Sequence, residues 1–153
     1  MIMAEKDVII KFVKEWAIGY VKHRDILTKN IIDIKEEPDR VIVKFKDKEQ
    51  VFLIRPTADD SFIQEISRDK DIGIVMINSK ENLDLLIKSW SKLIKFEKLT
   101  LFFINPFSEL DIKWFISPYV HDKICDNDSL KIGLKTMFET VEPITEKEIL
   151  KKI

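Results

Sequence analysis

The sequence is poor in the residues around which many enzyme sites are built. Its 153 residues include one cysteine, two histidines and three glycines. A single cysteine cannot form an internal disulfide, which favours a reducing compartment. No glycine-rich phosphate loop is present, and the GxSxG and HExxH patterns are also missing. These absences argue against small-molecule cofactor enzymes, and we expect no cofactor.

An excess of charge of one sign is missing as well. Lys and Arg together number 26 against 27 Asp and Glu, for a net charge of −1. A balanced chain exerts little long-range attraction on nucleic acid or on an anionic membrane. The only arginines are Arg24, Arg40, Arg55 and Arg68, and arginine is the residue that best grips phosphates and guanine edges. We therefore expect no nucleic-acid partner, although a local basic patch remains compatible with this balance.

Long hydrophobic runs are the third absence. No apolar run approaches the roughly 20 residues that a membrane-spanning helix requires, so we expect no membrane association. Charges interrupt the first segment, "MIMAEKDVIIKFVKEW", so no signal peptide is predicted. We expect a cytoplasmic protein. Abundant Lys, Ile and Glu would suit a thermophile, and an AT-rich genome would give the same bias.

The residues that are present suffice for one folded domain, which we expect to span 1–153. Hydrophobic residues make up 45% of the chain, enough for one sizeable core at this length. Apolar spacing predicts a helix from about Glu5 to Lys22. From 31 to 56 the period changes to two, which predicts a three-strand antiparallel meander ended by Pro56. Residues 57–71 fit a short helix or a surface loop.

The second half of the chain alternates strands and helices. "IGIVMIN" at 72–78 is typical of a buried strand and runs into a helix with Ser79 as its N-cap. Segments 99–106 and 112–120 predict a hairpin. Two helices follow, the second with a capping-box pattern from Thr145 to Glu148. The order α-βββ-(α)-β-α-ββ-α-α predicts an α+β fold, with helices covering one face of a twisted, mainly antiparallel sheet.

This element order resembles that of the secretion-chaperone-like fold, seen in type III secretion chaperones and small bacterial and archaeal relatives. In that fold a helix precedes a three-strand meander, followed by a helix, a hairpin and a final helix. The strand at 72–78 is an addition to that order. The resemblance spans most of the chain and rests on topology, without a shared motif. It implies a non-enzymatic dimer that binds other polypeptides.

The segment "ISPYVHDKICDND" (116–128) gathers most of the reactive side chains. His121, Asp122, Cys125 and Asp126 could ligate a metal locally, but zinc sites usually add a second ligand pair from elsewhere, and none is visible. His121 and Cys125 at i, i+4 could also form a nucleophile pair on one helix face. The simpler interpretation is a polar loop whose acids cap the following helix.

A metal-dependent nuclease or hydrolase using strand carboxylates is a further alternative. Asp33-x-Lys35 lies on the first strand of the meander, and Asp47 and Glu49 lie near its second turn. Such sites place an acid on one strand and an acid-x-Lys pair on the next. Here the pair comes too early in the meander, and alternating charges on a solvent-facing strand are common in a chain with 35% charged residues.

Aromatic residues give the strongest functional signal. The hairpin carries large side chains on both of its faces, and if helices cover only one face, the other exposes an apolar interface. The residues expected to form this interface are Phe102, Phe103, Phe107, Trp114, Phe115 and Tyr119. The leading hypothesis is therefore a non-enzymatic, chaperone-like or adaptor domain, expected to be a homodimer with a possible protein partner. The alternative is the metal-dependent hydrolase.

Overall fold

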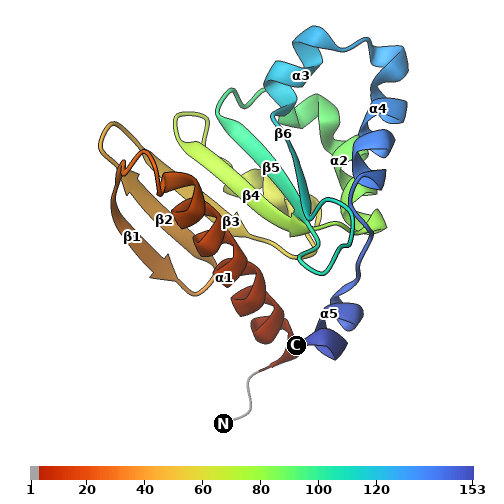
Figure 1. The fold of residues 1–153 in the computed structure, drawn as a ribbon. Helices are drawn as coiled ribbons and strands as arrows, with labels where there is room; N and C mark the ends of the chain where they lie inside the picture. Colours follow the sequence, from red (N-terminus) through yellow and green to blue (C-terminus); the bar gives the residue numbers. More distant parts are fainter. Residues whose placement is uncertain (1–3) are drawn as a thin grey trace.

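The computed structural model describes residues 4–153, which form a six-stranded sheet with helices on both faces (Figure 1). The strands lie side by side in chain order. They are β1 (Ile31–Glu37), β2 (Arg40–Phe45), β3 (Glu49–Ile54), β4 (Asp71–Ile77), β5 (Leu99–Ile104) and β6 (Lys113–Ile116). The helices are α1 (Glu5–Asp25), the 3₁₀ helix η1 (Asp60–Glu65), α2 (Lys80–Leu93), α3 (Pro118–Ile124), α4 (Asn127–Glu139) and α5 (Glu146–Lys152).

The sheet is mixed. β1, β2 and β3 form the predicted antiparallel meander, and β5 and β6 form the predicted hairpin. β4 lies parallel to both of its neighbours, β3 and β5. Parallel neighbours need a crossover connection, which η1 supplies before β4 and α2 supplies after it. The predicted α+β class is confirmed, with parallel pairing at the centre of the sheet.

Helices cover both faces of the sheet, so the expectation of one covered face is wrong. On one face η1, α2 and α4 pack on side chains such as Ile74, Phe103 and Trp114. On the other, α1 and α5 pack on side chains such as Val75 and Phe102. The physical reason is that β4 and β5 are apolar at almost every position, and strands of that kind must be covered on both sides.

The cover on the α1 face is incomplete. α1 packs on β2, β3 and β4, and α5 lies beside α1 near the lower end of the sheet in Figure 1. No helix stands in front of the β6 end of this face (Figure 1). On the α1 side of the sheet, the β5–β6 hairpin is therefore only half covered.

The predicted helix starts are confirmed, and one helix was not predicted. Ser79 accepts a hydrogen bond from the Asn82 backbone N–H at the start of α2, and Thr145 forms the capping box of α5 with Glu148. The return strand of the hairpin ends at Ile116 instead of 120, because Pro118 begins α3. Proline suits the first turn of a helix, since its missing N–H would have no partner there.

Candidate functional site

The reactive segment 121–126 serves the packing of α3 and α4. The Trp90 indole Nε1 donates to Asp122 Oδ1 at 3.1 Å, and the Trp90 and His121 rings meet edge to face at 5.7 Å. His121 Nε2 is buried without a hydrogen-bond partner. Cys125 Sγ lies 3.8 Å from Ser129 Oγ, and Asp126 caps α4 by accepting from the Asp128 backbone N–H. Within residues 4–153, no three His, Cys, Asp or Glu side chains gather as a metal would need.

The strand carboxylates are likewise not assembled into a nuclease site. Asp33 is exposed on the edge strand β1, and its partner on β2 is Lys44. The residue opposite Lys35 is Ile42. Asp47 accepts a hydrogen bond from Asn30 Nδ2 at 3.4 Å. No acid therefore stands on β2 opposite the Asp33-x-Lys35 pair.

The carboxyl ends of the parallel strands are filled by the chain itself. Open parallel sheets bind ligands beyond these ends, where the strand order reverses, but the order here runs without a reversal. After β4, Asn78 Nδ2 donates to the carbonyl oxygens of Phe138 and Val141, and Asn78 Oδ1 accepts from Trp114 Nε1 at 2.7 Å. After β5, Asn105 Nδ2 donates to the Glu142 carbonyl oxygen. These amides hold the segment after α4 against the strand ends.

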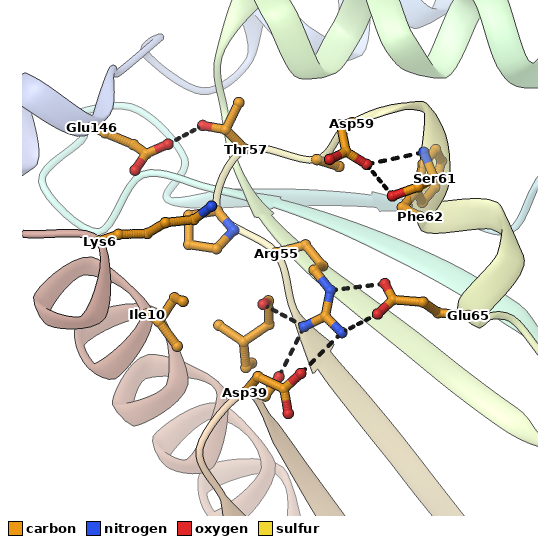
Figure 2. A pocket seen from close by; sticks show the side chains of 13 residues that line it. Lys6, Ile10, Asp39, Arg55, Thr57, Asp59, Ser61, Phe62, Glu65 and Glu146 are labelled. Carbon is orange, nitrogen blue, oxygen red and sulfur yellow. Dashed lines mark hydrogen bonds and ion pairs between the residues drawn. The ribbon is translucent and has the colours of Figure 1, made fainter. Parts of the chain in front are cut away.

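A cavity of about 320 Å³ remains beyond the end of β3, between α1 and η1. Figure 2 shows Arg55 at its wall between Asp39 and Glu65. All five N–H groups of the Arg55 guanidinium are used, two of them on the backbone oxygens of Asp39 and Ile54. Across the cavity, Thr57 donates to the Glu146 carboxylate. This arginine has no donor left for an anionic ligand.

The charges around Arg55 neutralise one another. Its hydrogen bonds to Glu65 raise the pKa of the Arg55 guanidinium above its ordinary value. A hydrogen bond from Arg40 lowers the pKa of the Asp39 carboxyl, outweighing the opposite effect of partial burial, and the charges of Arg40 and Arg55 lower it further. This cluster ties the turn before β2 to η1, which is a structural role.

The larger cavity, about 800 Å³, lies on the half-covered face and is called the hairpin groove below. It runs between the second half of α1 and the β5–β6 hairpin. Its lining residues are Trp16, Tyr20, His23 and Arg24 from α1, Gln50 from β3, and Thr100, Phe102, Ile112, Lys113, Phe115 and Ser117 from the hairpin and its ends.

Aromatic rings form the wall and floor of the hairpin groove. Trp16 and Tyr20 stack with their ring centroids 5.2 Å apart, and the Tyr20 ring meets Phe102 at 5.6 Å. Phe102 contacts Phe115 at 5.8 Å. Phe102 is 4% exposed, whereas Phe115 is 53% exposed. The contacting rings thus form a continuous series from the buried Phe102 to the exposed Phe115 within one groove.

The charged groups of the hairpin groove have one sign. The Arg24 guanidinium carbon lies 5.5 Å from the centroid of the Tyr20 ring, and Lys113 Nζ lies 5.4 Å from it. Arg24 Nη1 also donates to Tyr20 Oη at 3.3 Å. His23 is the third basic side chain, and none of the lining residues is acidic. The hairpin groove is therefore a local basic patch, although the net charge of the whole chain is close to zero.

The six predicted interface residues do not form one surface. Phe103 and Trp114 stack at 4.2 Å in the core beneath α2 and α4, where no partner can reach them. Phe107 stacks on Phe12, and Tyr119 lies on α3 and accepts from Lys123 Nζ. Phe102 and Phe115 line the hairpin groove.

The α1 side of the hairpin groove was missed. Trp16 and Tyr20 lie on the apolar stripe of α1, which predicts core residues, and both are in fact half-buried. The sequence signal that could have found the groove is the cluster "GYVKHR" at the end of the helix. There an aromatic residue and three basic residues surround Val21, the last buried residue of the helix.

Exposed apolar side chains are frequent in the segment from 110 to 132. Of the ten exposed large hydrophobic residues among those described, six lie between 110 and 132, on β6, its flanks, α3 and α4. They are Leu110, Ile112, Phe115, Val120, Ile124 and Ile132. Of these residues, Ile112 and Phe115 line the hairpin groove.

Comparison of the chain with models of protein families, with curated proteins and with solved structures finds no match. The resemblance to secretion chaperones therefore rests on element order alone. Among the described residues, no helix combines the length and the apolar character needed to cross a membrane.

Proposed function

We propose that this protein is a non-enzymatic binding domain that contacts a partner protein through the hairpin groove and the adjoining β6 edge. The observation that carries the proposal is the half-covered face of the hairpin. There a groove of about 800 Å³ joins buried aromatic rings to the 53% exposed Phe115. Interfaces combine aromatic anchors of this kind with a polar rim, and the basic groups of the groove supply such a rim.

The alternative of a metal-dependent hydrolase has no comparable support. His121 and Cys125 contact separate neighbours, and Asp33 faces a lysine across the meander. The cavity at Arg55 is lined by ion pairs that are already satisfied within the chain. A chaperone-like or adaptor role uses the surface features of the molecule, whereas a metal held by protein side chains alone would need a group of His, Cys, Asp or Glu that residues 4–153 do not bring together.

The experiment compares tagged wild-type protein with Phe115→Lys in the cells that make it, by quantitative mass spectrometry of co-purified polypeptides. The matched control is Ile32→Lys, which changes an apolar side chain that is 58% exposed on the opposite edge strand. We expect polypeptides that accompany the wild type and Ile32→Lys but not Phe115→Lys.

Sedimentation of the purified proteins tests the expected homodimer in the same series, because a second copy is one possible partner. A dimer that Phe115→Lys dissociates would support the proposed surface. If both variants are monodisperse, folded and indistinguishable from the wild type in partners and in size, the surface is not an interface and the proposal fails.

A further inference from the structure

We propose that the hairpin groove and the β6 edge bind an extended acidic segment of a partner protein, which adds as a seventh strand beside β6. This inference rests on the proposed function, since it names the chemistry of the partner for the same surface. Three features carry it: the free backbone groups of β6, the side chains next to them, and the charge of the groove.

The backbone of β6 offers hydrogen-bonding groups at the edge of the sheet. The Asn105 N–H donates to the Ile112 carbonyl oxygen at 2.8 Å. Hydrogen-bonded pairs alternate along an antiparallel ladder, so Trp114 and Ile116 also bond to β5. Lys113 and Phe115 occupy the other pairs, and their N–H and C=O groups point away from β5. No hydrogen bond from elsewhere in residues 4–153 reaches these groups.

The two edges of the sheet differ in their protection. β1 carries the exposed charged side chains of Asp33, Lys35 and Glu36 around the exposed Ile32, and such charges are how edge strands commonly resist pairing with other chains. β6 has instead the exposed ring of Phe115 beside two outward-facing backbone positions. The chain's own segment after α4 reaches this edge only at Asp111, whose N–H donates to the Thr140 carbonyl oxygen. Of the two edges, β6 from Lys113 onward is the one that we expect to accept an added strand.

The side chains beside that edge point into the hairpin groove. Phe115 lies opposite Phe102 and Lys113 lies opposite Ile104, so both share the face that α1 half covers. A strand added beside β6 would place alternate side chains over the groove. An apolar or aromatic side chain there would pack on Phe115 next to Tyr20.

The charge of the groove selects an acidic segment. His23, Arg24 and Lys113 line it without any acidic residue. Carboxylates on the added strand would therefore be attracted to the groove and strengthen binding, whereas ammonium groups would be repelled and weaken it. A second copy paired antiparallel through β6 with Lys113 on the two-fold axis would bring two Lys113 side chains together, and no acidic side chain of the groove would offset them. Nucleic acid could stack on Phe115 but has no N–H and C=O ladder to match the strand edge.

The test uses ¹⁵N-labelled protein titrated with a nine-residue peptide in which glutamate alternates with valine around one central phenylalanine. The comparison peptide has lysine in place of every glutamate. We expect the backbone amide signals of Lys113 and Phe115 to shift. The dissociation constant of the acidic peptide should be at least tenfold lower than that of the lysine peptide at low salt. Lys113→Glu should raise the dissociation constant of the acidic peptide about tenfold above the wild-type value. Lys131→Glu, an exposed change on α4, should leave it unchanged.

The outcomes separate this inference from the proposed function. If neither peptide shifts these amides while Phe115→Lys still loses its co-purified polypeptides, the acidic strand is wrong and the binding surface stands. A wild-type dimer whose β6 amides are already protected from exchange also overturns the acidic strand, in favour of a second copy. If twelve-residue oligothymidylate shifts the same amides more strongly than the acidic peptide, both are overturned in favour of nucleic acid.

Discussion

Phe102 and Phe115 lie directly opposite each other on β5 and β6, with ring centroids 5.8 Å apart, yet only Phe102 is buried. Tyr20 of α1 reaches Phe102 and covers it. No side chain of α1 forms a comparable ring contact with Phe115. The boundary between core and surface on this face therefore falls between two strands of one hairpin, and the hairpin groove occupies that boundary.

Adjacent residues of β6 should respond very differently to substitution. Trp114 is 4% exposed, stacks on Phe103 and donates to Asn78, so Trp114→Ala should reduce the free energy of unfolding by about 3–5 kcal/mol. Phe115→Ala should change it by less than about 1 kcal/mol, because the ring is 53% exposed. Urea denaturation of the two variants measures both values. Equal losses would mean that Phe115 is a core residue and not part of a free surface.

Gly73 is required by close packing of two aromatic rings. A Cβ at this position would lie 2.9 Å from Phe52 Cδ1 and 3.2 Å from Phe102 Cε2. Gly73→Ala should therefore lower stability by about 1–3 kcal/mol. Gly133→Ala is the matched control, since nothing lies within 4 Å of its Cβ and it sits inside α4. There alanine should raise stability by up to about 1 kcal/mol, and a rise at position 73 would contradict the packing argument.

Asn78 joins β4 to the hairpin and to the end of α4 through its side-chain amide. Asn78→Ala would leave the Trp114 indole N–H and the carbonyl oxygens of Phe138 and Val141 without their present partner. Each buried group left unpaired costs about 1–3 kcal/mol, so a loss of roughly 3 kcal/mol or more is expected in thermal or urea unfolding. Asn127→Ala, an exposed change at the start of α4, should cost much less. If Asn78→Ala and Asn127→Ala lose similar amounts of stability, water replaces the hydrogen bonds of the Asn78 amide.

Asp39 should contribute stability that acid removes. Its hydrogen bond from Arg40 holds the pKa of its carboxyl below the ordinary value, and the charge of Arg55 acts in the same direction. A carboxyl whose pKa is lower in the folded state stabilises that state above its unfolded pKa of about 4, and the contribution disappears as pH falls through the folded pKa. Asp39→Asn should therefore be less stable than the wild type at pH 7, with the difference shrinking below about pH 4.

Urea midpoints at pH 7 and at pH 3 measure this change, with Asp84→Asn as the control. Asp84 is exposed and makes one ion pair, with Lys80 on the same helix, so its replacement should have little effect at either pH. If the difference in stability between the wild type and Asp39→Asn is the same at both pH values, the ion pairs of Asp39 are not its source.

Local patterns in the sequence were sufficient for most elements of the fold. The alternation from 31 to 56 predicted the meander, the apolar run after Asp71 predicted β4, and Ser79 and Thr145 marked two helix starts. Such signals depend only on neighbours within a few residues, so they can be recognised without knowing how the rest of the chain folds. Strand direction is different, because β4 could have paired in either direction until η1 and α2 fixed the crossovers.

The candidate site could be predicted only in part. The aromatic hairpin was visible, and Phe115 was among the residues named, but Phe103 and Trp114 belong to the opposite face of the same strands. Which rings are covered depends on where α1 crosses the sheet, and that is a contact between segments about 80 to 100 residues apart. His121 and Cys125 attracted attention by their chemistry, yet the fold separates their contacts.

The sequence by itself determined the α+β class, the order of the elements apart from α3, and the near-balance of charge, because propensity, periodicity and composition are local or additive properties. The tertiary structure decided the mixed sheet, the covered carboxyl ends of its strands and the hairpin groove. Each of these depends on which surfaces distant segments bury together. The Tyr20 ring that joins α1 to Phe102, and leaves Phe115 at the surface, is the clearest case.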